Sequence, residues 1–92
     1  MTPERRRVVF SGKVQGVGFR MTAMHFAQDL PLSGTVRNLE DGRVELLVEG
    51  PPDQIDALLQ LLREHFGAFI RTMDQHPAPS TGAMSPGLRV AH

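Results

Sequence analysis

The chain has 92 residues, its ten Lys and Arg balance its ten Asp and Glu, and it contains no cysteine. This length predicts one domain, residues 1–92, with a modest core, and the balanced charge argues against nucleic acid as a partner because no net positive field would hold a polyanion. The lack of cysteine excludes disulfides and thiolate metal sites, and no apolar run approaches the roughly 20 residues that span a bilayer, so we expect a cytoplasmic monomer that enters no membrane.

Hydrophobic periodicity predicts a strand and then a helix in the first third of the chain. From Arg7 to Ser11 the side chains alternate, with Val8 and Phe10 on one face, as in a half-buried strand. From Phe19 to Leu30 the apolar residues recur at helical spacing. We expect this helix to end at Pro31, because the residue before a proline disfavours the helical conformation.

A hairpin and a second helix are predicted next. Residues 34–39 and 43–49 flank Asp41-Gly42, a dipeptide suited to the positive φ angles of a hairpin turn. Asp53 is placed to cap a helix that ends at Gly67. The apolar residues of this helix recur at the intervals of one buried face: Ile55, Leu58, Leu59, Leu62 and Phe66.

The last third of the chain predicts a strand at residues 68–73 and a short edge strand at residues 88–90. Between them, Asp74 to Gly87 is rich in proline and glycine and predicts a loop. The order β-α-β-β-α-β is that of the split βαβ, or ferredoxin-like, sandwich. We therefore expect an α+β fold in which two helices cover one face of an antiparallel sheet.

The segment GKVQGVGFR, from Gly12 to Arg20, indicates an anion site between the first strand and the first helix. Gly16 and Gly18 can adopt positive φ, which lets consecutive backbone N–H groups converge on one anion. Arg20 is expected in the first helical turn, where its charge opposes the helix dipole unless an anion is bound. A glycine-rich turn that serves only tight strand-to-helix packing is the alternative. The segment matches neither the Walker nor the dinucleotide-binding motif.

Two further segments make this loop resemble that of the acylphosphatases: GTVRN at residues 34–38 and GRVELLVEG at residues 42–50. That family hydrolyses acyl phosphates to a carboxylate and inorganic phosphate, without a metal, a cofactor or a covalent enzyme intermediate. The resemblance implies that Asn38 orients the attacking water, that Arg20 binds the phosphate, and that the small-molecule substrate is held by a loop of six residues: Gln15, Gly16, Val17, Gly18, Phe19 and Arg20.

Some positions depart from the pattern that the resemblance implies. Thr35 stands where the family usually has an aromatic residue, Thr22 and Ala23 where it often has an aromatic residue followed by threonine, Pro31 where it has glycine, and Leu88 where it has phenylalanine. None of these positions has a direct catalytic role in the family. Lost aromatic side chains near the site could change which acyl group fits.

Two other functions fit the same fold. A non-catalytic phosphate-binding or regulatory module would use the loop but would not need both Arg20 and Asn38. A single-stranded RNA binder would need aromatic side chains on the open face of the sheet. The chain has no Tyr or Trp, and all five phenylalanines fit core positions: Phe10, Phe19, Phe26, Phe66 and Phe69.

Overall fold

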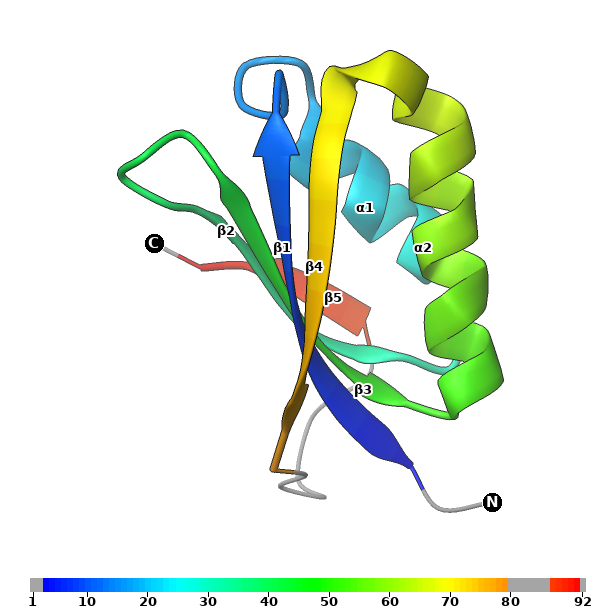
Figure 1. Ribbon diagram of the computed structural model, residues 1–92. Helices are drawn as coiled ribbons and strands as arrows, with labels where there is room; N and C mark the ends of the chain where they lie inside the picture. The colour runs from blue at the N-terminus through cyan, green and yellow to red at the C-terminus, as the bar shows by residue number, and fades with distance from the viewer. Residues whose placement is uncertain (1–2, 80–86, 92) are drawn as a thin grey trace.

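Five strands form one sheet in the order β4-β1-β3-β2-β5, and two helices cover one of its faces (Figure 1). The arrangement comes from a computed structural model, which describes residues 3–79 and 87–91. The elements are β1 (Glu4–Gly12), α1 (Phe19–Ala27), β2 (Ser33–Asn38), β3 (Val44–Gly50), α2 (Pro52–Phe66), the 3-10 helix η1 (Gly67–Phe69), β4 (Ile70–Ala78) and β5 (Gly87–Val90).

The predicted ferredoxin-like α+β fold is confirmed, but the sheet is mixed and not wholly antiparallel. The pairs β1–β3, β1–β4 and β2–β3 are antiparallel, whereas β5 runs parallel to β2. The direction follows from the path of the chain. β4 occupies the edge beside β1, and β5 runs opposite to β4 at the other edge, which makes it parallel to its neighbour.

Each helix differs from its predicted bounds at one end, α1 where it stops and α2 where it starts. The helix α1 stops at Ala27, where the Gln28 amide donates to the His25 carbonyl at 3.2 Å. A further turn, closed by the Leu30 amide and the Ala27 carbonyl at 3.1 Å, lies between the helix and Pro31. The helix α2 starts one residue before Asp53, at Pro52, and no side chain caps it. Proline suits a first helical position because it has no N–H to leave unbonded, so the predicted Asp53 cap is wrong.

The second half of the sheet differs more from the prediction. The chain passes through η1 before β4 begins at Ile70, and the strand continues to Ala78, through residues predicted as loop. Pro77 is compatible with a strand because β4 is an edge strand. Phe69, predicted to lie in the core, has 46% of its surface exposed. Residues 80–86 of the predicted loop lie outside the described residues.

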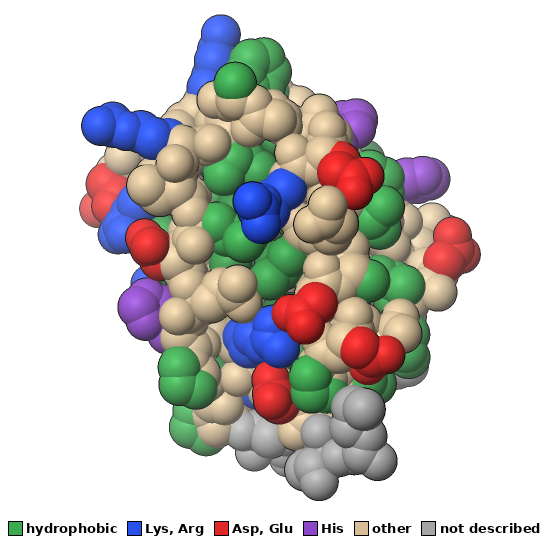
Figure 2. Space-filling model, turned by 45° about the vertical axis from the view of Figure 1, so that its right-hand side comes forward, with side chains coloured by type: hydrophobic (Ala, Val, Ile, Leu, Met, Phe, Trp, Pro, Cys, Tyr) green, Lys and Arg blue, Asp and Glu red, His purple; other side chains and the backbone are tan. Residues whose placement is uncertain are grey.

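The core lies between the helices and the sheet. Its α2 contribution is the predicted face of five residues, all buried: Ile55, Leu58, Leu59, Leu62 and Phe66. Phe19 of α1 packs between Phe10 of β1 and Phe66 of α2, with both ring-centroid distances at 4.8 Å. Hydrophobic side chains also fill the space between β4 and α2 (Figure 2), where Ile70 and Met73 are half-buried. Through Phe19, the first residue of α1, this core anchors the start of the helix to β1 and α2.

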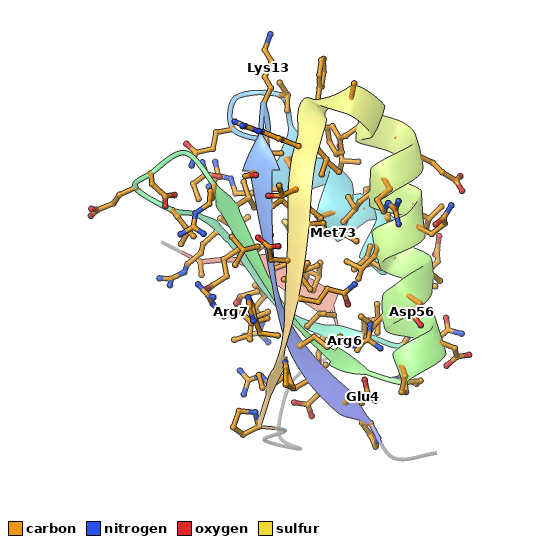
Figure 3. All side chains as sticks on the ribbon, in the orientation of Figure 1. Glu4, Arg6, Arg7, Lys13, Asp56 and Met73 are labelled. Atoms are coloured by element: carbon orange, nitrogen blue, oxygen red, sulfur yellow. The ribbon has the colours of Figure 1, made fainter. Side chains whose placement is uncertain are left out.

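Charged side chains cover parts of the structure that the core leaves open. Between β1 and α2, Arg6 donates to Asp56 Oδ1 at 2.7 Å and lies beside Glu4 (Figure 3). On the sheet face turned away from the helices, Glu45 of the central strand accepts from Arg7 Nε at 2.7 Å and from Arg37 Nε at 2.8 Å. We call this second group the Arg7–Glu45–Arg37 ladder. In the described part of the chain, the helices are too short or too polar for any of them to cross a bilayer.

Candidate active site

The loop between β1 and α1 has the backbone conformation that its glycines predict. Gly16 and Gly18 have φ angles of +77° and +78°, in the left-handed region that favours glycine. Gly18 immediately precedes α1 and caps it through its carbonyl, which accepts from the Thr22 amide at 2.9 Å. Within the described residues, the amides of residues 16–21 donate no backbone hydrogen bond. These donors are therefore free to bind an anion at the start of the helix.

Phe19 fixes this loop to the core. Its ring is 2% exposed and stacks on Phe66, so a ligand cannot reach it. Val17 is also half-buried and packs against the core. At Val17 and Phe19, therefore, only the backbone N–H groups can contact a ligand. The two side chains anchor the loop to the core.

A recess of about 110 Å³ opens beside the loop. It brings together Arg20 from the first turn of α1 and Asn38, the last residue of β2. Because Asn38 pairs with Val44, whose side chain is buried on the helix side of the sheet, Asn38 lies on that same side. Figure 1 shows the β1–α1 loop and the β2–β3 turn at the same end of the molecule. The fold thus places a cation and a carboxamide on one small hollow.

Arg20 has no acidic partner among the described residues. It is half-buried, as are Arg5, Arg6 and Arg7, and each of those three lies within 4.0 Å of a carboxylate oxygen. A half-buried arginine without a counter-ion, beside free amides at a helix N-terminus, is electrostatically prepared for an anion.

Gln15 holds the loop to the neighbouring turn. Its Nε2 donates to the Leu39 carbonyl at 2.8 Å and to the Arg43 carbonyl at 2.9 Å, at the two ends of the β2–β3 turn. Gln15 therefore connects the loop that carries Arg20 with the turn that follows Asn38. The sequence places Gln15 in the loop but does not reveal this contact, because the contact depends on how two distant segments meet.

The β2–β3 turn that follows Asn38 has its own internal bonds. Gly42 has a φ angle of +94°, as expected for the hairpin, although Asp41 does not have a positive φ. The Arg43 amide donates to Asp41 Oδ1 at 3.1 Å, and the Arg43 side chain contacts the other carboxylate oxygen at 2.7 Å. These bonds, the backbone one first, lower the pKa of Asp41 below its ordinary value. The turn is held closed on both sides of Gly42.

The recess contains most, but not all, of the predicted site residues. Gly16, Gly18, Phe19, Arg20 and Asn38 line it, whereas Gln15 and Val17 do not. Two lining residues were missed by sequence analysis: Val14, which is buried, and Met21, which is exposed. The described residues contain no group of three or more His, Cys, Asp or Glu side chains placed to hold a metal ion.

Comparison with known proteins agrees with the fold and identifies the family. A family model described as acylphosphatase matches residues 6–85. The chain belongs to the acylphosphatase family. A Synechococcus sp. acylphosphatase is 48% identical over 85 residues, which cover 90% of this chain and 84% of that protein. Among solved structures, an acylphosphatase from Coxiella burnetii is 33% identical, with a TM-score of 0.82 and coverage of 97% and 93% of the two chains. Acylphosphatase from Bacillus subtilis superposes with a TM-score of 0.86 at 26% identity, covering 99% and 100%.

The positions that depart from the acylphosphatase pattern lie in different environments. Ala23 and Leu88 are buried in the core. Thr35 precedes the buried Val36 in β2, so its side chain lies on the open face of the sheet and not beside the recess. Thr22 lines a hollow that also borders Met21, and Leu88 lines another hollow that Met21 borders. Thr35 therefore makes no direct contact with the recess.

Proposed function

We propose that this chain is an enzyme that hydrolyses acyl phosphates to a carboxylate and inorganic phosphate in the recess beside Arg20. The observation that carries the proposal is the half-buried Arg20 without an acidic partner among the described residues, next to backbone amides 16–21 that make no backbone hydrogen bond there. A phosphoryl group would receive hydrogen bonds from both. Family membership supports the same reaction.

The phosphoryl group is the part of the substrate that the loop is suited to hold. As the bond to the leaving carboxylate breaks, negative charge spreads over the equatorial phosphoryl oxygens. Fixed amide dipoles and the Arg20 guanidinium are already oriented before the reaction, so they stabilise this charge without reorganising. Arginine is suited to the role because its planar fork can bind two oxygens at once. Positioning and charge supply most of what this reaction needs.

Asn38 is proposed to hold the attacking water. Its carboxamide lines the recess together with Arg20, and no described side chain hydrogen-bonds to it. A carboxamide oxygen can orient a water by accepting a hydrogen bond from it, but it is too weak a base to remove a proton from the water. Since no Asp, Glu or His lines the recess, the proton must go to an oxygen of the substrate phosphate. The substrate then acts as its own base, and no group of the protein changes its protonation state.

We extend the proposal to the setting in which the enzyme acts. The substrate is a small molecule, in keeping with a recess of about 110 Å³. The lack of cysteine supports a cytoplasmic location, and equal numbers of basic and acidic residues argue against a nucleic-acid partner. A monomeric state is part of the same proposal. Metal independence also belongs to the proposal, because the reaction as derived assigns every step to Arg20, the amides, Asn38 and the substrate.

The direct test is steady-state hydrolysis of benzoyl phosphate by the purified chain, with and without excess EDTA. We expect turnover that EDTA does not change and that inorganic phosphate inhibits competitively, since product and substrate phosphoryl groups share one site. Loss of activity with EDTA and its recovery with Mg²⁺ or Zn²⁺ would contradict the mechanism. Phosphate binding without any hydrolysis would favour the alternative of a non-catalytic phosphate-binding module.

A further inference from the structure

Met21 is an exposed apolar side chain at the edge of the proposed phosphoryl site. It is 70% exposed, against 46% for Phe69 and 37% for Leu61, the other large hydrophobic residues exposed in the described part of the chain. A single exposed apolar side chain is common on protein surfaces. The position of Met21 distinguishes it, because it directly follows Arg20 and lines the same recess.

A second hollow on α1 shares Met21 with the recess. It has a volume of about 470 Å³ and is lined by Met21, Thr22, His25, Phe26 and His65. Phe26 and His65 meet edge to face with their ring centroids 5.6 Å apart, which gives the hollow an aromatic side. Among the described residues, no Asp, Glu, Lys or Arg lines it. We call this hollow the Met21 depression.

We propose that the Met21 depression holds the acyl group of the substrate, and that it favours acyl phosphates whose acyl group is apolar and aromatic. The inference rests on the proposed function, because it takes the phosphoryl group to be held at Arg20. The acyl carbon is joined to that phosphoryl group through a single oxygen, so it must lie just outside the recess. Met21 lines both hollows and is therefore the residue that the acyl group meets first. Met21 also borders a hollow of about 390 Å³ on the β5 side of α1, but no phenylalanine lines that hollow among the described residues, so the Met21 depression is the better match for an aromatic group.

The chemistry of the lining residues suits an aromatic acyl group. Met21 and His25 are four residues apart on α1, so their side chains lie on the same face of the helix. A thioether adapts its shape and makes favourable contacts with aromatic rings. Covering Met21 would also remove apolar surface from water. A small acyl group such as acetyl would reach Met21 but would leave most of the depression empty.

The test compares kcat/KM for benzoyl phosphate and acetyl phosphate in the parent chain, Met21→Ala and Met21→Leu. The matched control is Leu61→Ala, which removes an exposed apolar side chain of α2 that lines neither hollow. We expect Met21→Ala to lower kcat/KM for benzoyl phosphate by roughly tenfold, several times more than for acetyl phosphate, mainly through KM. Met21→Leu should recover most of the loss, and Leu61→Ala should leave kcat/KM unchanged for both substrates.

The result separates this inference from the proposed function. If the parent chain hydrolyses both substrates, and Met21→Ala lowers kcat/KM equally for both or for neither, the inference is wrong while the proposed function stands. If the parent chain hydrolyses neither substrate, the proposed function fails and this inference fails with it. Inhibition by inorganic phosphate gives a further check. Its inhibition constant should rise much less in Met21→Ala than KM for benzoyl phosphate does, because phosphate meets Met21 only at the recess and not in the depression.

Discussion

Arg20 and Arg7 are both half-buried arginines, yet they lie in opposite electrostatic environments. Arg7 is on the open face of the sheet, where its Nε lies 2.7 Å from a carboxylate oxygen of Glu45. Arg20 is at the end of the sheet, beside a recess, and has no acidic partner among the described residues. The same cation is neutralised by the protein in one place and left for a ligand in the other.

The difference indicates which arginine serves stability and which serves function. An arginine whose carboxylate is part of the protein contributes in the absence of any ligand, whereas an arginine without one gains its partner only on binding. We therefore expect substitutions in the Arg7–Glu45–Arg37 ladder to change the melting temperature and leave catalysis intact. Substitutions at the recess should do the reverse.

The largest expected effect is that of Arg20→Gln. It removes a charge-assisted contact with two phosphoryl oxygens, worth roughly 3–6 kcal/mol, so kcat/KM and phosphate affinity should both collapse while the melting temperature changes little. Arg20→Lys should recover only part of the activity, because an ammonium group cannot bind two oxygens in the same fork. Benzoyl phosphate kinetics, phosphate titration and thermal melts measure these quantities.

The matched control for Arg20→Gln is Arg7→Gln. This variant loses a cation of the same type from the sheet face, so it should keep kcat/KM and melt at a lower temperature. Equal loss of activity in the two variants would mean that the net charge of the chain, and not the position of Arg20, determines catalysis. Unchanged phosphate affinity in Arg20→Gln would remove Arg20 from the phosphate site.

Asn38→Ala should have the next largest effect, on kcat alone. Asn38 is proposed to contact the water and not the phosphate, so its loss should lower kcat by about a hundredfold and leave the phosphate dissociation constant nearly unchanged. Because Asn38 is the last residue of β2, circular dichroism and a thermal melt must first show that the variant is folded. Full kcat in a folded Asn38→Ala variant would contradict the role assigned to the water.

Gln15→Ala tests whether the loop and the turn act as one unit. The variant loses two hydrogen bonds to main-chain carbonyls at the ends of the β2–β3 turn. Each is worth about 1 kcal/mol, and their loss lets the segments that carry Arg20 and Asn38 move apart. We expect kcat to fall by roughly tenfold with a smaller rise in KM. A suitable control is Gln60→Ala, whose amide contacts only Glu64 on the surface of α2.

The result that distinguishes a positioning role is the effect of Gln15→Glu. A carboxylate cannot donate to the two carbonyls and also adds a negative charge near the phosphate, so this variant should be less active than Gln15→Ala. If both Gln15 variants keep the parent kcat, the contact stabilises the turn but does not position the catalytic residues.

Local patterns predicted most of the secondary structure and the backbone conformation of the β1–α1 loop, since both depend on neighbouring residues. The positive φ angles of Gly16 and Gly18 and the buried face of α2 follow from residue type and spacing. The errors arose where distant segments decide the outcome. β5 runs parallel to β2 because β4 and β5 run in opposite directions at the two edges of the sheet. Phe69 is exposed because it belongs to η1 and not to the strand that follows.

The site was predictable in part for the same reason. Arg20 and the glycines are adjacent in sequence, so their association with one anion could be inferred from the loop itself. The contact of Gln15 with the β2–β3 turn, and the exposure of Met21 between two hollows, depend on tertiary packing that no local pattern encodes. The resemblance to a family supplied Asn38, which the loop alone does not indicate.

The smallest predicted effect concerns the ladder, through Glu45→Gln. Glu45 is 8% exposed in the central strand, and while burial alone would raise its pKa, the hydrogen bonds from Arg37 and Arg7 outweigh burial and hold the pKa below its ordinary value of 4.5. A carboxyl group with a lowered folded-state pKa adds stability above its unfolded pKa and loses that stability as pH falls through the folded pKa. Glu45→Gln should therefore lower the free energy of unfolding at neutral pH by about 1 kcal/mol, and the melting temperature by a few degrees. The expected effect is small because both arginines are partly exposed and screened by water.

The pH dependence decides whether that loss is electrostatic. The gap between the melting temperatures of parent and Glu45→Gln should narrow as pH falls from about 7 to about 3. Protonation removes the negative charge of Glu45 from the parent, and the substitution has already removed that charge from the variant. A gap that stays constant over this range would mean that packing, and not the charge on Glu45, explains the loss. At neutral pH, kcat for benzoyl phosphate should be the same in both chains. If Glu45→Gln lowers kcat without changing the melting temperature, the sheet-face ladder acts on catalysis, and the division between it and Arg20 is wrong.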